Sequence, residues 1–436
     1  MVNCKFKFIC IVLLYLIILF TCGCTVANVL YDDYNNIAQD PSFEYKAPQV
    51  IHAIKKTENL SIEYNAEVHT PSNSKLSVFE VSKRNYSASD YREIMDYLEP
   101  NGEWYAQDKR TSDELNMILD WLQDPHDFYN NEDVEPYLSY IEEAVNHSDN
   151  TLPKKFRFDT IHNGNLFIAY CRNNGHYSAI KGELGGNSFT YMRNADAVVI
   201  RERNLEYDDP CEKFFLQSPT ISYQDAQTMS DEILTVFGMD DEYSLKLSER
   251  SIGMINNFSV SNGWSFIYTR YNAGLNSEYI DNYDIWINSG MPQLVSPWGQ
   301  EYILVYVDGD GVFCFSVHGA GVQGKCIAEN VVIEEFNLLT ETIERQLEKQ
   351  HTPIDPRIYN SCITINRIEL CIALVSDSDI RTGVIIPAWA VHYSLVYSIN
   401  GNTVEDDLCT FFNAIDGNYI EPRISINEIK KIMEPK

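Results

Sequence analysis

The chain has few basic residues for its size. Its 436 residues include 33 lysines and arginines against 63 aspartates and glutamates, which gives a formal net charge of −30 at pH 7. A surface of this sign repels phosphate backbones and lacks the basic face that nucleic-acid binding requires. We therefore expect no nucleic-acid partner. The excess of acids is typical of a protein that charge keeps soluble, although it would also attract cations or basic peptides.

The chain also lacks the short motifs of common hydrolases, peptidases and redox proteins. It has no GxSxG, HExxH or CxxC sequence, so no nucleophile elbow, zinc-peptidase helix or thioredoxin-like site is indicated. The glycines Gly319, Gly321 and Gly324 spell GxGxxG, but an extended run follows them, which favours a turn over a dinucleotide site. These absences favour a protein without catalytic activity, and we expect no cofactor and no metal.

One apolar run near the N-terminus has the properties of an export signal. It extends from Phe8 to Phe20 after Lys5 and Lys7. Its 13 residues are fewer than the roughly 18 to 20 that cross a bilayer as a helix. Basic residues, a short apolar run and then small residues form the order of a signal peptide that is removed.

The cysteines at the end of this run predict a lipid anchor. A bacterial lipoprotein signal ends in small residues followed by a cysteine whose thiol receives a diacylglyceryl group. Cys24, which follows Gly23, is the expected attachment point, and Cys22 is the alternative. A plain secretory signal stays open as a second interpretation. Two acyl chains would hold the protein on a membrane, so we expect it at the extracytoplasmic face of the cell membrane.

The periodicity of apolar residues predicts an α+β fold, with antiparallel sheets and helices packed on one face of each sheet. Residues 60–83 contain two alternating runs around a Thr-Pro-Ser-Asn-Ser segment, which is typical of a hairpin. Ser222 and Asn330 each precede a helical pattern that strand-like runs follow. This shared plan suggests a weak internal duplication.

The expected organisation follows from changes in composition along the chain. It comprises a lipoprotein signal peptide (1–24), a flexible tether (25–48), an N-terminal α+β domain (49–215) and two helix-plus-meander domains (216–325 and 326–436).

Two groups of cysteines have spacings that suggest chemistry. Cys314 and Cys326 flank a glycine-rich turn and are candidates for a disulfide across a hairpin, with isolated buried thiols as the alternative. Cys171 could approach His162 or His176, but it lies within the apolar run LFIAYC. A buried structural thiol is therefore the preferred interpretation of Cys171.

Several segments resemble a family of uncharacterised lipoproteins from low-GC Gram-positive bacteria, known only by a domain of unknown function. They are the lipobox-like start, LSIEYNAEVHTPSNSKLSVFEV, the Ser-capped helix with Ala226 and Gly238, NVVIEEFNLLTETI, and PAWAVHY with FFNAIDG. Within the last pair, the family-like motif comprises Pro387, Trp389, Asn413, Asp416 and Gly417. It is also similar to the closing strands of PepSY-like and YycI-like envelope domains. The resemblance implies binding or regulation at the outer membrane face, with an envelope protein or peptide as partner, and it brings no catalytic residues.

Our leading hypothesis is a lipid-anchored protein that binds or regulates something at the cell envelope. One alternative is an envelope hydrolase or peptidase-related enzyme with a non-standard site. Another is a solute- or glycan-binding lipoprotein that uses the aromatic clusters Trp264–Tyr268 and Tyr283–Trp286. The simpler interpretation of both clusters is the packing of sheet faces.

Overall fold

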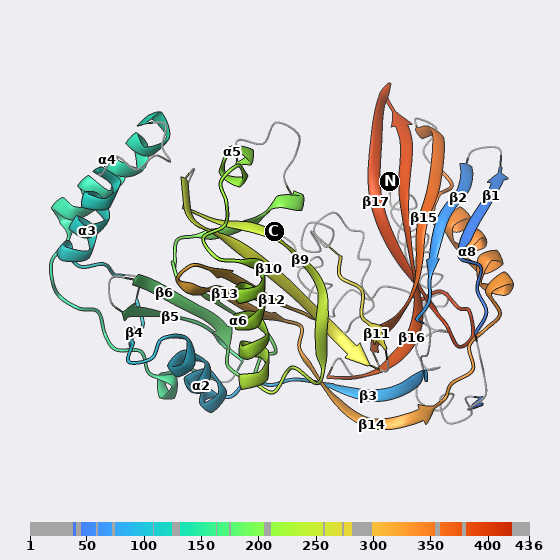
Figure 1. Ribbon diagram of the computed structural model, residues 1–436, viewed down its shortest axis with the longest axis horizontal. Coiled ribbons are helices and arrows are strands. Elements are labelled where there is room, and N and C mark those ends of the chain that lie inside the picture. The colour runs from blue at the N-terminus through green and yellow to red at the C-terminus, as the bar shows by residue number, and fades with distance from the viewer. Residues whose placement is uncertain are drawn as a thin grey trace, which may run out of the picture. The chain divides into compact units, whose positions relative to one another are not determined.

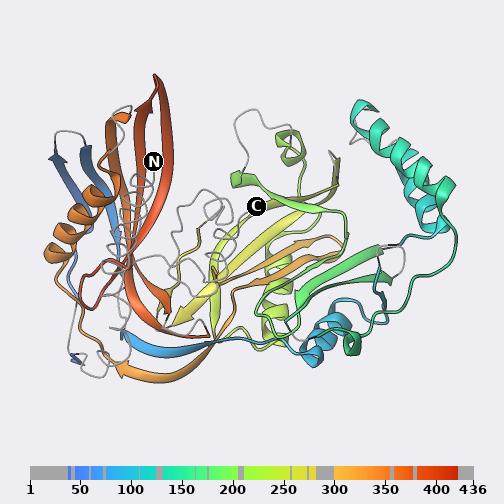
Figure 2. The ribbon, with the colours of Figure 1, turned by 180° about the vertical axis from the view of Figure 1, so that it is seen from behind.

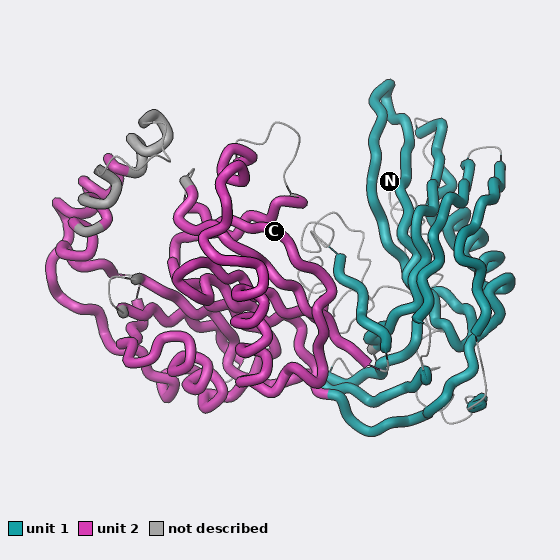
Figure 3. Tube along the Cα trace, in the orientation of Figure 1, with its two compact units in different colours: residues 1–82, 273–298, 323–436 teal, residues 83–272, 299–322 magenta. Residues whose placement is uncertain are grey.

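The computed structural model describes residues 38–40, 45–57, 60–71, 75–107, 109–123, 131–162, 164–173, 176–204, 211–255, 258–272, 274–280, 299–353, 358–376 and 381–420. The signal peptide and most of the tether, with Cys22 and Cys24, lie outside these residues. Among the residues described, no helix is both long and apolar enough to cross a membrane. The chain forms two compact units: unit 1 is Met1–Ser82, Ala273–Trp298 and Gln323–Lys436, and unit 2 is Lys83–Asn272 and Gly299–Val322 (Figure 3).

Unit 1 contains a seven-stranded sheet with the helix α8 packed against it (Figure 1). The strands of this sheet are β1 (Val50–Lys56), β2 (Leu60–His69), β3 (Ser77–Lys83), β14 (Gly321–Glu329), β15 (Ile358–Ser376), β16 (Thr382–Ile399) and β17 (Asn402–Asn413), and the helix α8 covers Phe336–His351. The short strand β11 (Leu275–Asn276) also belongs to unit 1 but is not part of this sheet. The strand order is β1-β2-β15-β16-β3-β14, and β17 also pairs with β16. Strands β15, β16 and β17 form an antiparallel meander, whereas β2 and β15 run parallel.

The core of unit 1 is built from one face of a strand and one face of a helix, on which apolar residues recur at different spacings. Strand β2 buries every second residue, beginning with Leu60 and Ile62, because successive side chains of a strand point to opposite faces. Helix α8 buries Leu339, Ile343 and Leu347, which recur every fourth residue and therefore share one face of the helix. These two faces meet in one apolar core.

Unit 2 contains a larger sheet with the strand order β4-β5-β6-β7-β13-β12-β10-β9-β8 (Figure 1 and Figure 2). Its helices are α2 (Ala88–Leu98), α3 (Ser112–Gln123), α4 (Asn131–His147), α5 (Glu212–Phe215) and α6 (Tyr223–Val236), with 3-10 turns at Phe158–Thr160 and Glu202–Asn204. Its strands are β4 (Glu103–Tyr105), β5 (Leu166–Asn173), β6 (His176–Glu183), β7 (Phe189–Met192), β8 (Val198–Arg201), β9 (Tyr243–Ile255), β10 (Phe258–Asn272), β12 (Tyr302–Asp308) and β13 (Gly311–His318).

Side chains of β12 supply two cores on opposite faces of this sheet. Ile303 and Val305 join the core that also contains residues of α2 and α6. Tyr306 points to the other face, where it joins a core with Leu115 of α3 and Ile141 of α4. Helical residues therefore cover both faces of the sheet in unit 2, whereas we expected helices on one face.

The predicted α+β class with antiparallel sheets is confirmed. Ser222 caps α6 as expected, because its hydroxyl oxygen accepts a hydrogen bond from the backbone N–H of Asp225 at 3.1 Å. The hairpin expected over residues 60–83 is wrong, since β15 and β16 lie between β2 and β3 in the sheet. The helix expected after Asn330 begins only at Phe336.

The two units cut across the three consecutive domains expected at 49–215, 216–325 and 326–436. Strand β2 of the first segment pairs with β15 of the last, and β7 of the first pairs with β13 of the second. Composition and periodicity report on neighbours along the chain, so they contain no direct signal for such pairings.

Candidate functional site

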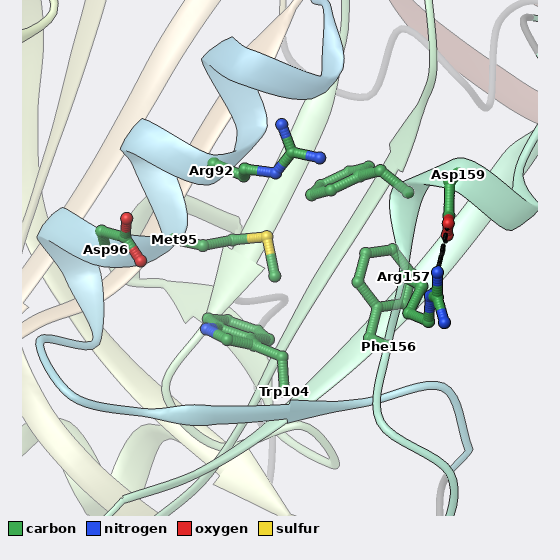
Figure 4. A pocket seen from close by; sticks show the side chains of 8 residues that line it. Arg92, Met95, Asp96, Trp104, Phe156, Arg157 and Asp159 are labelled. Carbon is green, nitrogen blue, oxygen red and sulfur yellow. Dashed lines mark hydrogen bonds and ion pairs between the residues drawn. The ribbon is translucent and has the colours of Figure 1, made fainter.

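One pocket of unit 2 combines apolar walls with charged groups at its rim. Its volume is about 430 Å³, within the roughly 300 to 1,000 Å³ that is usual for small-molecule sites. It is lined by Arg92, Met95, Asp96, Trp104, Phe156, Arg157, Phe158 and Asp159. Figure 4 shows the Met95 thioether, the Trp104 indole and the Phe156 ring around one space, with Arg157 turned toward Asp159. We call this space the aromatic pocket.

Helix α2 supplies one wall of the aromatic pocket, and its start is held by a capping box. The Ser87 backbone N–H donates to Asp90 Oδ2 at 2.6 Å, and the Asp90 N–H donates to Ser87 Oγ at 3.3 Å. Met95 is buried, whereas Arg92 and Asp96 are exposed. The helix thus presents an apolar side chain between two charged ones, each within one turn of it.

The other wall comes from β4 and the segment at 156–159. Trp104 lies on β4, and its carbonyl oxygen accepts a hydrogen bond from the backbone N–H of Phe156 at 2.8 Å. This bond ties the two aromatic residues to the same edge of the sheet. The buried Phe158 meets Phe156 edge-on at 4.9 Å and Tyr91 of α2 at 6.1 Å between ring centroids. The walls are therefore joined through packed rings.

Of the four charged residues at the rim, two form an ion pair with each other and two do not. Arg157 and Asp159 form a two-point ion pair, with Nε 3.0 Å from Oδ1 and Nη2 2.5 Å from Oδ2. The hydrogen bond from Arg157 holds the pKa of the Asp159 carboxyl below its ordinary value. Arg92 lies over the Phe158 ring at 5.3 Å from its centroid. Within the described part of the chain, the side chains of Arg92 and Asp96 form no hydrogen bond or ion pair.

Trp104 contributes a polar group with no protein partner. Its indole Nε1 is buried, and no acceptor among the described residues lies within hydrogen-bond distance of it. A buried N–H without an acceptor costs about 1 to 3 kcal/mol, and because this atom has almost no exposed surface, a ligand in the pocket would not reach it. Apart from this atom, the lining of the aromatic pocket can hold an apolar group, accept an anionic group at Arg92 and accept a cationic group at Asp96.

A second pocket of unit 2, of about 480 Å³, lies beside α3 and α4. Its two basic side chains already have partners. Lys109 Nζ lies 2.6 Å from Asp149 Oδ1, and Arg110 pairs with Asp196. This pocket therefore offers fewer unsatisfied groups than the aromatic pocket does.

A cysteine and a histidine meet in unit 1, where they could suggest nucleophilic catalysis. Cys409 Sγ lies 3.8 Å from His392 Nε2, and Glu278 Oε1 lies 3.7 Å from the same nitrogen. Arg367 Nη2 is 2.9 Å from that nitrogen, and because a guanidinium only donates, Nε2 must accept. A catalytic histidine instead uses one ring nitrogen for the nucleophile and the other for the orienting carboxylate.

The thiol in this cluster is also poorly suited to attack. Burial, with a smaller contribution from Glu278, raises the pKa of Cys409 well above its ordinary value. The thiolate is the nucleophilic form, so the cluster does not favour the hydrolase alternative. Among the described residues, no group of three or more His, Cys, Asp or Glu side chains is arranged to hold a metal ion.

The structure brings the family-like motif together on β16, β17 and the turn that follows. Trp389 pairs with Phe412, and the backbone N–H of Ala414 donates to the Pro387 carbonyl oxygen at 3.0 Å. Asn413 accepts the N–H of Gly417, whose φ of +68° suits glycine in a turn. The Asp416 carboxylate accepts the backbone N–H of Asn418 at 2.9 Å.

Trp389 itself is only 1% exposed, and its ring meets Phe336 of α8 edge-on at 5.5 Å. These contacts are the packing of a sheet against a helix. The motif therefore has a structural explanation in unit 1.

Cys314 and Cys326 do not face each other across a hairpin. Cys314 lies on β13, which pairs with β12 and β7, whereas Cys326 lies on β14 in the other sheet. All seven cysteines in the described part of the chain are free thiols. Cys171 is fully buried, and burial raises its thiol pKa, as expected of a structural cysteine.

The glycine-rich and aspartate-rich sequences form turns. Gly319, with φ of +57°, lies in the turn between β13 and β14, and Gly321 and Gly324 lie within β14, so GxGxxG leads into a strand and not into a helix. Asp308 pairs with Gly311 at the turn between β12 and β13. Trp264 donates its indole N–H to the Ile221 carbonyl oxygen and packs on Tyr223, and the cluster Tyr283–Trp286 lies outside the described residues.

Sequence reasoning did not single out the residues of the aromatic pocket. A signal was present in the run Phe156-Arg157-Phe158-Asp159, where aromatic and charged residues alternate. Alternation of this kind is equally typical of an ordinary edge strand. The approach of this run to Trp104 and to α2 is a tertiary contact that no local pattern encodes.

Comparisons with known proteins leave the site to be argued from its own chemistry. No family model matches the chain, and no curated protein matches it. A crystal structure of an uncharacterized protein from Eubacterium rectale ATCC 33656, at 1.45 Å resolution, is similar over 87% of this chain and 94% of that chain, with 13% sequence identity and a TM-score of 0.43.

Proposed function

We propose that the protein is a membrane-anchored binding protein of the cell envelope, and that its aromatic pocket in unit 2 holds a small ligand with an apolar or aromatic group. The single observation that carries the binding role is a pocket of about 430 Å³ whose apolar walls include Met95, Trp104 and Phe156 and whose rim carries the exposed charges of Arg92 and Asp96. The extracytoplasmic location rests on the export-signal pattern of residues 1–24 and on the resemblance of the family-like motif to envelope domains.

Binding is favoured over catalysis by the state of the reactive groups. In the aromatic pocket, Arg157 and Asp159 neutralise each other, and the lining includes no Cys, Ser or His that could act as a nucleophile or base. In unit 1, the cluster around His392 keeps its thiol protonated. A ligand in the aromatic pocket would thus meet side chains that can orient it, among them the carboxylate of Asp96.

The proposal is tested by ligand titration of the full-length protein purified in detergent. Aromatic and aliphatic amino acids and short oligosaccharides serve as probes, and isothermal titration calorimetry gives the dissociation constants. Trp104→Ala removes part of the apolar wall of the pocket, so we expect the affinity for a bound probe to fall about tenfold. Tyr359→Ala, at an exposed position of unit 1, is the control and should leave the affinity unchanged.

Two results would contradict the proposal. One is the absence of binding by every probe at millimolar concentration. The other is binding that Trp104→Ala leaves as strong as in the unaltered protein, because the ligand would then occupy a different site.

A further inference from the structure

From the charges at the rim of the aromatic pocket, we infer that its ligand is a free α-amino acid in its zwitterionic form, with an apolar or aromatic side chain. The carboxylate binds Arg92, the ammonium group binds Asp96, and the side chain enters between Met95, Trp104 and Phe156. This inference rests on the proposed binding function and names the class of ligand.

The spacing of Arg92 and Asp96 suits two opposite charges on one small molecule. The residues are four apart on α2, which places their Cβ atoms about 5 to 6 Å apart. The ammonium and carboxylate groups of an α-amino acid are attached to one carbon atom, so adjacent side chains can bind both. The capping box at Ser87 holds the first turn of this helix and thereby fixes the two positions.

Both charged side chains are available to a ligand. No ion pair forms between them, and Figure 4 shows Arg92 and Asp96 on opposite sides of Met95. The guanidinium of Arg92 lies over the face of Phe158, which leaves the N–H groups at its edge free to form a two-point contact with a carboxylate.

The balance of charge at the rim disfavours ligands of one sign. Two arginines and two aspartates line the pocket, so the rim has no net charge. A simple anion could pair with Arg92 but would leave Asp96 without an ionic partner, and a simple cation could pair with Asp96 but would leave Arg92 without one. A neutral sugar would leave Arg92 and Asp96 without ionic partners. A zwitterion satisfies both charges and adds no net charge to the pocket.

The apolar walls of the pocket determine which amino-acid side chains it would bind most tightly. Met95 and Phe158 are buried, and Trp104 and Phe156 are half-buried. An aromatic or branched aliphatic side chain would remove their remaining surface from water.

The test uses calorimetric titration of the full-length protein with L-phenylalanine, L-tryptophan and L-leucine. Three analogues of phenylalanine separate its groups: phenethylamine lacks the carboxylate, 3-phenylpropionate lacks the ammonium group, and N-acetyl-L-phenylalanine amide has neither charge. We expect at least one amino acid to bind, and each analogue of phenylalanine to bind at least about tenfold more weakly than phenylalanine does.

Two variants connect this effect to the named residues. Arg92→Gln and Asp96→Asn should each weaken amino-acid binding about tenfold. Their matched controls are Lys181→Gln on β6 and Glu93→Gln on α2, which change charge by the same amounts at exposed positions outside the pocket. The controls should bind as the unaltered protein does, and thermal unfolding should show all four variants folded.

The outcomes separate the inference from the proposed function. If N-acetyl-L-phenylalanine amide binds as well as phenylalanine, or if Arg92→Gln and Asp96→Asn both bind normally, the zwitterion is excluded while a binding pocket is retained. If oligosaccharides bind and amino acids do not, the inference is likewise overturned. If no probe binds, the proposed function fails with it.

Discussion

Arg270 and Glu301 are joined by two hydrogen bonds in the interior of unit 2. Arg270 Nε donates to Glu301 Oε2 and Nη2 donates to Oε1, both at 2.7 Å. The same Oε1 accepts the Tyr243 hydroxyl and the Gly321 backbone N–H, each at 2.7 Å. Arg270 is 1% exposed, so its charge is balanced almost entirely by this network. Removing Arg270 leaves the buried carboxylate of Glu301 without its cation, whereas removing Glu301 leaves Arg270 with Glu242, whose Oε2 lies 3.0 Å from Arg270 Nη1.

Arg270→Met should lower the free energy of unfolding by about 3 to 5 kcal/mol, because Glu301 would keep a buried charge with no cation beside it. Urea unfolding followed by tryptophan fluorescence measures the effect. The double variant Arg270→Met with Glu301→Leu should be less destabilised than the single variant, since it buries no charge. A double variant that is less stable than the single one would show that the ion pair itself stabilises the unit.

His351 should make unit 1 less stable in weak acid. Burial lowers its pKa to about 4, below the ordinary value of about 6.5 that applies in the unfolded chain. Well above pH 6.5 His351 is unprotonated in both states, and as the pH falls through 6.5 toward 4 the unfolded state takes up the proton first. The stability therefore decreases over this range, by about 3 kcal/mol in total.

His351→Gln removes the titrating group while keeping a polar partner for Tyr393, whose Oη lies 2.8 Å from His351 Nε2. We expect the unfolding free energy of this variant to depend less on pH between 7 and 4, measured by urea titration at four pH values. His69→Gln, at an exposed position, is the control. Parallel pH profiles for the unaltered protein and His351→Gln would exclude this role.

Trp389→Ala should destabilise unit 1 by about 3 to 5 kcal/mol, because it opens a cavity where the sheet meets α8. Thermal and urea unfolding measure the loss. Tyr359→Ala, on the surface of the same sheet, should change stability by less than about 0.5 kcal/mol. If Trp389→Ala were as stable as the unaltered protein, the family-like motif would need an explanation other than packing.

Cys24→Ala should release the protein from the membrane or block its processing, because the diacylglyceryl thioether could not form. Membrane fractionation gives the first readout, and mass spectrometry of the native N-terminus should find a diacylated Cys24. The matched control is Cys22→Ala, which should remain anchored. Normal retention of Cys24→Ala would move the attachment point to Cys22, and an unmodified mature protein in the medium would exclude a lipid anchor.

Local patterns in the sequence predicted those parts of the fold that are stabilised by contacts between residues close together in the chain. The cap at Ser222, the end of α6 before Gly238 and the strands of the meander β15 to β17 follow from hydrogen bonds and apolar periods within short windows. The partners of β2 and β3 were not predictable in this way. Alternation shows which face of a strand is buried, but it does not identify the strand beside it.

The aromatic pocket likewise combines a part that the sequence pattern predicts with contacts that it does not predict. The charged and apolar positions of α2 can be read from the helical period, yet the pocket exists only because Phe156 and Trp104 reach this helix from distant parts of the chain.

The sequence by itself determined the class of fold, the helix cap at Ser222 and the acidic charge, because each depends on composition or on residues a few positions apart, whereas the lipid anchor stays a prediction. Only the tertiary structure decided which strands share a sheet, that Cys314 and Cys326 lie on strands of different sheets, and that Arg92 and Asp96 flank an apolar pocket. Those features depend on the joint burial of apolar residues that lie far apart in the sequence. The free energy that stabilises them therefore arises only in the complete fold.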